Sequence, residues 1–156
     1  RAYMDESIEV AKEKGYVETI YKRKRFLPDI NSHNAIVRGY AERNAINAPI
    51  QGSAADIIKV AMVRIFNRFE TEGLRSKMIL QVHDELNFNV YKDELEKVKQ
   101  IVLDEMENAI KLQVPLIADC GEGVNWLEAH SHKVYKSQHL YTIFVVKFIA
   151  RSCNIT

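Results

Sequence analysis

The sequence predicts an α+β fold in which helices pack on an antiparallel sheet. The prediction rests on a change in hydrophobic period. Apolar residues in 58–69 recur at spacings of three and four, as on one face of a helix, and Gly73 closes that stretch. Residues 78–90 then alternate with a period of two, which is typical of half-buried strands. A second helical pattern covers 95–109, and this mixed order of segments favours an antiparallel sheet.

The chain before this stretch is predicted to begin with a helix and a hairpin. A helix covers 3–14, because Gly15 follows it at the position of a C-cap. Residues 16–21 alternate and are rich in β-formers, so they predict a strand. Residues 25–27 are its expected returning partner.

Two separate helices are predicted next. One covers 35–47, and another begins near Pro49, because proline suits the first turn of a helix. Ser53 and Asp56 have the spacing of a capping box, so Asp56 is interpreted as a residue of the helix start.

The alternating stretch predicts a tight β-hairpin. Only His83-Asp84-Glu85 separates its two strands, 78–82 and 86–90. The residues expected on one side of each strand are Met78, Leu80 and Val82, and Leu86, Phe88 and Val90. A short last strand over 116–120 follows the helix.

The composition restricts the class of protein but does not identify a binding partner. The chain has 156 residues, 47% hydrophobic and 28% charged, which fits one globular domain with a core of its own. Cys120 and Cys153 form no disulfide or metal pattern, so a reducing compartment is expected. Residues 141–150 contain Lys147 and are half the roughly 20 residues of a spanning helix, so no membrane partner is expected.

The two ends of the chain differ from its body. Residues 1–14 already have the pattern of the middle of a helix, so the sequence is interpreted as a piece of a longer protein. The character of the sequence changes at Ser131. We therefore expect a domain over 1–130 and an extra tail over 131–156 that is not native to it. In this interpretation 141–150 has no partner and the tail is dispensable.

The predicted hairpin tip is the first candidate site. Its three polar residues would place a pair of carboxylates at the edge of a rigid sheet. Adjacent side chains on extended backbone diverge, so one of Asp84 and Glu85 would bind a cation while the other flanks it. Mg²⁺ takes a few carboxylate oxygens and keeps waters for substrate phosphates. The alternative is an acidic turn without function, since turns favour aspartate anyway.

Two further groups are candidates for contact with nucleic acid. Arg43, Asn47 and Gln51 are four residues apart and would line one helical face. A cation and two amides suit the degenerate acceptors of a minor groove, although a solvated helix face explains the spacing equally. The basic run Lys22 to Arg25 could bind phosphates despite the net charge of +1, or form a solvated turn.

Several segments together resemble one family. Gln81-Val82-His83-Asp84-Glu85-Leu86 is similar to motif C of the family A DNA polymerases. Ala41-Glu42-Arg43 with Asn47 to Asp56, residues 15–30, and Gly121-Glu122-Gly123 with Trp126-Leu127 resemble other parts of that family in the same order. The resemblance covers about residues 1–130.

The resemblance implies a palm-type antiparallel sheet, part of a right-hand DNA polymerase domain. It implies that Asp84 binds both catalytic Mg²⁺ ions, that Glu85 supports it and that His83 lies near the primer terminus. It also implies contact of the primer–template duplex with Arg43, Asn47 and Gln51, near enough to Asp84 to flank one primer terminus. Less specifically, the resemblance implies that Arg23 and Arg25 lie at template or primer phosphates.

The expected activity is that of a DNA-directed DNA polymerase in replication and repair. Primer–template DNA and deoxynucleoside triphosphates are its partners, with no obligate protein partner, in the cytoplasm of a bacterium at the nucleoid. Two parts of the family's catalytic site are missing from this sequence. One is the second metal-binding aspartate, which the family carries in a strand resembling Asp-Tyr-Ser. The other is the fingers helix that binds the incoming nucleotide. We therefore expect the isolated chain to be inactive.

Two other functions remain open. The chain could be a non-catalytic module that binds duplex DNA. It could also be a metal-dependent phosphohydrolase that uses His83-Asp84, in which case the doublet would lie on a helix with further histidine and aspartate ligands. The secondary structure around His83 separates the last hypothesis from the first.

Overall fold

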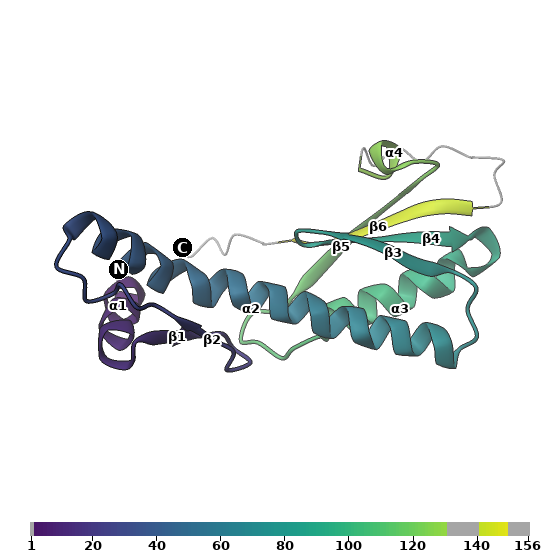
Figure 1. Cartoon of the computed structure of the whole chain (residues 1–156). Helices are drawn as coiled ribbons and strands as arrows, with labels where there is room; N and C mark the ends of the chain where they lie inside the picture. Colours follow the sequence, from purple (N-terminus) through teal and green to yellow (C-terminus); the bar gives the residue numbers. More distant parts are fainter. Residues whose placement is uncertain (1, 131–140, 150–156) are drawn as a thin grey trace, which may run out of the picture. The chain divides into compact units, whose positions relative to one another are not determined.

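The computed structural model describes residues 2–130 and 141–149, and the chain divides into two compact units, 1–56 and 57–156 (Figure 1). The boundary falls within one long helix, α2. None of the helices in the described residues has the length and apolarity that a bilayer crossing requires.

The first unit contains a helix, a two-stranded hairpin and the beginning of α2. Its elements are α1 (Ala2–Lys14), β1 (Tyr16–Glu18), β2 (Lys24–Phe26) and the first part of α2 (Ala35–Thr71). The N–H of Gly15 donates to the Ala11 carbonyl at 2.8 Å, and Gly15 has φ 75°, so the predicted C-cap is confirmed. β1 and β2 pair antiparallel as predicted, although β1 is shorter than expected. The buried core of this unit consists of Ala11, Val17, Leu27, Ile30, Ala41 and Ala45.

The prediction of two helices around Pro49 is wrong, because α2 continues through the proline. Proline inside a helix removes one backbone hydrogen bond and costs about 3 kcal/mol. The packing of α2 before and after Pro49 outweighs that cost. Ala41 and Ala45 are buried in the first unit, and Ile58 is buried in the second. Asp56 is correspondingly inside the helix and does not start it.

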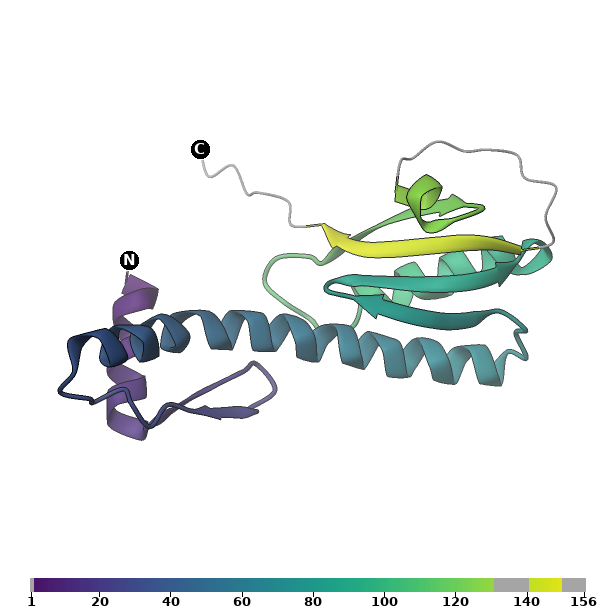
Figure 2. The ribbon, with the colours of Figure 1, turned by 45° about the horizontal axis from the view of Figure 1, so that its top comes forward.

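The second unit is a four-stranded antiparallel sheet with helices on both faces (Figure 2). Its strands lie in the order β3-β4-β6-β5. The elements after α2 are β3 (Lys77–Val82), β4 (Glu85–Tyr91), the 3-10 turn η1 (Lys92–Glu94), α3 (Leu95–Glu107), β5 (Ile117–Gly123), α4 (Trp126–His130) and β6 (Tyr141–Ile149).

One face of the sheet packs against α3 and the second half of α2. Leu86, Phe88 and Val90 of β4 are fully buried there. The rings of Phe69 and Phe88 lie 5.9 Å apart. The helical residues of the same core include Ile58, Ala61, Ile65, Val98, Ile101, Val102 and Met106. The predicted packing of the 57–69 helix on the hairpin strands is confirmed.

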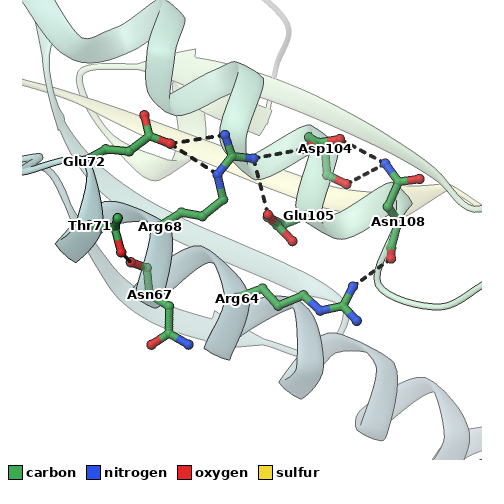
Figure 3. A network of polar contacts seen from close by, with 8 residues as sticks. All are labelled: Arg64, Asn67, Arg68, Thr71, Glu72, Asp104, Glu105 and Asn108. Atoms are coloured by element: carbon green, nitrogen blue, oxygen red, sulfur yellow. Dashed lines mark hydrogen bonds and ion pairs between the residues drawn. The ribbon is translucent and has the colours of Figure 1, made fainter.

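Arg68 of α2 also ties the two helices together (Figure 3). Its guanidinium contacts Asp104 at 2.8 Å and Glu105 at 3.3 Å, both on α3, and Glu72 at 3.2 Å in the turn that follows α2. Arg64 adds a hydrogen bond from Nη1 to the backbone oxygen of Asn108 at 2.8 Å. These contacts fix how the two helices lie on the sheet.

Strand β3 departs from the predicted alternation. The register shifts between Met78 and Leu80, so an irregularity interrupts the pairing at Ile79. A bulge adds one residue to a strand and changes which side the following residues face. Met78 pairs with Phe88 but Leu80 pairs with Asn87, and these neighbours on β4 face opposite sides, so the prediction that Leu80 lies on one side with Met78 is wrong. Leu80 is 55% exposed.

The other face of the sheet is covered by the short helix α4, on the side away from α3 in Figure 1. A Cβ atom added at Gly121 would lie 1.9 Å from the Ala129 backbone oxygen, so only glycine permits this approach. Asn87 and Val145 share this face with Gly121, because the three are register partners.

The expectation that 141–150 has no partner is also wrong. β6 pairs with β4 on one side and with β5 on the other, along its whole length. Strand pairing joins residues far apart in sequence, so the local pattern of the tail could not reveal it. The rest of the predicted tail, 131–140 and 150–156, lies outside the described residues.

Candidate functional site

The predicted hairpin tip is a two-residue turn. Val82 and Glu85 are the last paired residues, so only His83 and Asp84 form the turn. His83 has φ 53°, and a positive φ at the first turn position suits the right-handed twist of hairpin strands. The side-chain amide of Gln81 donates a hydrogen bond to the His83 carbonyl at 3.0 Å, which supports the turn.

The tip presents its acidic residues on a rigid support. His83 and Asp84 are exposed, whereas Glu85 is half-buried at the start of β4. The next residue, Leu86, is fully buried in the core. Asp84 therefore faces solvent from a fixed turn, while Glu85 belongs to the strand and lies on extended backbone.

The tip offers the right kind of ligand for Mg²⁺ but too few ligands for a complete site. Carboxylate oxygens are the donors that Mg²⁺ prefers. Within residues 2–130 and 141–149, no group of three or more histidine, cysteine or acidic side chains could hold a metal ion. Asp84 fits the role of one metal ligand, and the partners for a full site have to come from other residues.

This geometry also removes the phosphohydrolase hypothesis. That hypothesis places His83-Asp84 on a helix with further ligands. The doublet instead forms a turn between β3 and β4, and the described residues add no third donor. The physical reason is the period-two pattern on both sides, which favours strands.

A row of polar residues lies on the first half of α2. Arg43, Asn47 and Gln51 are all exposed and are four residues apart on one uninterrupted helix. Because α2 continues through Pro49, the helical spacing holds from Arg43 to Gln51 and places the three on one face. These residues belong to the first unit and Asp84 to the second. Their proximity to Asp84 remains a prediction.

Arg23 has a structural role that the sequence did not reveal. Its guanidinium contacts Asp56 Oδ1 at 2.9 Å and donates to the Gly52 carbonyl at 3.2 Å. Thr19 Oγ1 donates to the other Asp56 oxygen at 2.6 Å. A Cβ atom at Gly52 would lie 2.7 Å from the Thr19 methyl group, so the close approach requires glycine. This clamp holds the β1–β2 hairpin on α2.

Arg25 is freer than Arg23 to meet a ligand. It is exposed, and it makes a long hydrogen bond of 3.4 Å from Nη2 to Asn44 Oδ1. Arg23, Arg25 and Gln51 line one small hollow of the first unit. The structure thus brings together three residues that the sequence predicted separately for contact with DNA.

Comparison with known proteins identifies the family. The model of "DNA polymerase family A" matches residues 1–128. The chain belongs to DNA polymerase family A. The matched residues include the α2 face, the hairpin tip and strands β3, β4 and β5, but not β6.

Curated proteins that match the chain include bacterial DNA polymerase I proteins. That of Streptococcus pneumoniae serotype 4 is 57% identical over 127 residues, which are 81% of this chain and 14% of the relative. That of Caldicellulosiruptor bescii is 49% identical over 128 residues, 82% of this chain and 15% of the relative. The chain thus spans about one seventh of the length of these curated relatives.

A solved structure shares the fold. The "POL domain of Pol1 from M. smegmatis complex with DNA primer-template and dNTP" matches with a TM-score of 0.73 and 49% identity. The match covers 74% of this chain and 20% of that chain. The predicted mixed fold with a polymerase-type antiparallel sheet is confirmed.

Proposed function

We propose that residues 1–130 are the C-terminal part of the polymerase domain of a DNA-directed DNA polymerase acting in replication and repair. In this proposal the complete protein joins a deoxynucleotide to the 3′-hydroxyl of a primer paired with a template. The observation that carries it is an exposed Asp84 on a two-residue turn between β3 and the largely buried strand β4, in a chain of DNA polymerase family A. A cytoplasmic, nucleoid-associated location in a bacterium follows from that role.

Asp84 is proposed as the metal ligand of the site. Two Mg²⁺ ions would activate the attacking hydroxyl and stabilise the leaving oxygen. Asp84 is exposed on the turn and can supply carboxylate oxygens to them. Glu85 is half-buried and is assigned to supporting Asp84. His83, in the same turn, is assigned to the region of the primer terminus.

Arg43, Asn47 and Gln51 are proposed to lie along the minor groove of the primer–template duplex. The amide groups can donate to the acceptors that all base pairs share there, so they would recognise duplex shape more than sequence. Arg25 is assigned to the phosphate backbone. Arg23 is assigned mainly to the clamp on Asp56, which leaves its exposed side for phosphate.

A non-catalytic, duplex-binding function is the second candidate for the chain by itself. The exposed α2 face and the hollow beside it suit a duplex. The described residues supply no third metal donor at the tip. A lone carboxylate holds Mg²⁺ weakly, because the ion gives up its waters reluctantly.

The test is a chimera in which residues 1–127 replace the matching stretch of the S. pneumoniae DNA polymerase I. We expect the chimera to extend a primer with Mg²⁺ and nucleotides, and the isolated 156-residue chain to extend none. Arg43→Ala, Asn47→Ala and Gln51→Ala in the chimera should each weaken duplex engagement or rate with little sequence dependence. Glu70→Ala, an exposed residue elsewhere on α2, is the control.

Either of two results would refute parts of this proposal. A folded chimera that binds duplex but extends no primer contradicts the polymerase function. Primer extension by the isolated chain contradicts the assignment of a partial site.

A further inference from the structure

The carboxylate of Asp56 is the point at which the β1–β2 hairpin is fixed to α2. Both Nε and Nη2 of Arg23 lie 2.9 Å from Asp56 Oδ1. The hydroxyl of Thr19 donates to the other oxygen, Oδ2, at 2.6 Å. The Asp56 side chain is 12% exposed, so little of the carboxylate remains for solvent. Both of its oxygens are therefore engaged by the hairpin.

A second contact ties the same hairpin to an earlier part of α2. Arg25 donates from Nη2 to Asn44 Oδ1 at 3.4 Å. Asn44 lies about three turns before Asp56 on this helix. Asn47 and Gln51 lie between these two points of attachment. The hairpin is thus held beside the stretch of α2 that is proposed to meet the minor groove.

We propose that Asp56 is a positioning residue for duplex binding. Through Arg23 it holds Arg25 where it can reach a phosphate while Gln51 contacts the minor groove. The inference rests on the duplex contacts proposed above for Arg25 and Gln51, and it assigns to Asp56 no contact with DNA.

The geometry of the hairpin explains why such positioning matters. Arg23, Arg25 and Gln51 line one hollow, so a shift of the hairpin changes the spacing between a phosphate contact and a groove contact. A group that is already held in its binding position loses less conformational freedom when the ligand arrives. The clamp on Asp56 raises the affinity for duplex for that reason.

The negative charge of Asp56 separates a positioning role from a simple electrostatic effect. A carboxylate close to DNA phosphates opposes binding, because like charges repel. Without a positioning role, neutralising Asp56 would leave the duplex affinity unchanged or raise it. With that role, the same substitution lowers the affinity although it makes the chain more basic.

Asp56→Asn in the chimera with S. pneumoniae DNA polymerase I is the direct test. We expect the affinity for primer–template duplex to fall about three- to tenfold at one salt concentration. The slope of log affinity against log salt should become shallower by about one, as for one lost phosphate contact. Glu13→Gln is the matched control, because it removes the same charge at an exposed position of α1, and should leave affinity and slope unaltered. An affinity that Asp56→Asn leaves unchanged or raises would overturn the proposal.

Two further variants show whether Asp56 acts through the hairpin. In a chimera that already carries Arg23→Gln, Asp56→Asn should change the affinity less than about twofold, because the group it acts through is gone. Losses that multiply independently would overturn the proposal. Thr19→Val removes the other hydrogen bond to Asp56 without changing the charge, and should lower the affinity about two- to threefold. It takes the place of Asp56→Asn if that variant fails to fold, and an unchanged affinity would then overturn the proposal.

Hydrogen exchange of the 156-residue chain without DNA gives an independent measure. The N–H of Thr19 donates to the Arg23 carbonyl at 3.0 Å, and the N–H of Arg23 donates to Thr19 Oγ1 at 3.2 Å. Asp56→Asn should speed exchange at these two amides several-fold, while the amides of α1 keep their rates. Unchanged exchange at both would overturn the proposal, because Asp56 would then not fix the hairpin.

The outcomes also separate this proposal from the polymerase function. A chimera that binds no duplex contradicts the proposed function. A chimera that binds duplex and extends primers, but loses no affinity with Asp56→Asn, contradicts only the positioning role.

Discussion

The two faces of the sheet in the second unit are built in different ways. On one face, Leu86, Phe88 and Val90 pack against two helices whose apolar residues repeat at regular spacing. On the other, the short α4 approaches Gly121, and Asn87 is buried without a partner among the described residues. The packing of the first face follows from the local sequence pattern. The second face depends on long-range contacts, and the hydrogen-bonding groups of Asn87 on it are not paired with any described residue. The difference predicts where substitutions will be costly and where they will be tolerated.

The largest effect is expected from Phe88→Ala on the helix-covered face. Phe88 is fully buried and contacts Phe69, so its truncation should destabilise the chain by about 3–5 kcal/mol. Leu80→Ala, at a 55% exposed position of β3, is the control and should cost less than about 1 kcal/mol. Urea unfolding followed by circular dichroism measures both. Equal losses for the two variants would show that this face is not the main core.

An intermediate effect is expected at Glu94, a well-satisfied polar group that contrasts with Asn87. Burial alone raises the pKa of the Glu94 carboxyl, but hydrogen bonds from Ser76 and Arg75 outweigh it and lower the pKa from 4.5 to about 2. The Ser76 hydroxyl donates to Glu94 at 2.6 Å, and the Arg75 side chain donates at 3.0 Å. The folded state therefore gains stability from the ionised carboxylate.

Glu94→Gln should cost on the order of 1–2 kcal/mol at neutral pH, because it weakens charge-assisted hydrogen bonds that are partly screened by solvent. The folded pKa is depressed, so this contribution is complete above pH 4.5 and is lost as pH falls toward about 2. Unfolding measured across that range should bring wild type and Glu94→Gln together at the acidic end. A constant difference at all pH values would contradict the role of the ionised carboxylate.

The smallest effect is expected at Val145 of β6, and Val146 on the same strand is its matched contrast. Val146→Thr puts a hydroxyl into the apolar core and should cost about 1–3 kcal/mol. Val145→Thr puts the same hydroxyl opposite Asn87, where a hydrogen bond should offset that cost to within about 0.5 kcal/mol or stabilise the chain. Thermal unfolding of both variants decides the matter. If Val145→Thr costs as much as Val146→Thr, the Asn87 side chain does not form a hydrogen bond with the hydroxyl at position 145.

The parts of the fold that the sequence predicted are those with strong local periods. The helix over 57–69, the hairpin around His83 and helix α3 each follow from the spacing of their own apolar residues. The row from Arg43 to Gln51 also follows from its four-residue spacing, which α2 keeps because the helix continues through Pro49. In these elements the local pattern and the packing agree.

The parts that the sequence did not reveal depend on distant residues. The Arg23–Asp56 clamp joins positions 33 apart, and no local pattern marks it. Pro49 is held inside a helix by cores on either side, against its own preference. The partner strands of β6 are likewise remote in sequence, and its apolar run by itself does not say what it pairs with.

The central claim is that Asp84, and not its neighbour Glu85, holds the metal ions of a polymerase site. Single-turnover primer extension at saturating DNA, in the chimera with S. pneumoniae DNA polymerase I, tests it most directly. We expect Asp84→Ala to abolish most of the rate while duplex binding stays near that of the unaltered chimera, and Glu85→Ala to cost less. A mild effect of Asp84→Ala together with a severe effect of Glu85→Ala would contradict the assignment and reverse the roles of the two carboxylates.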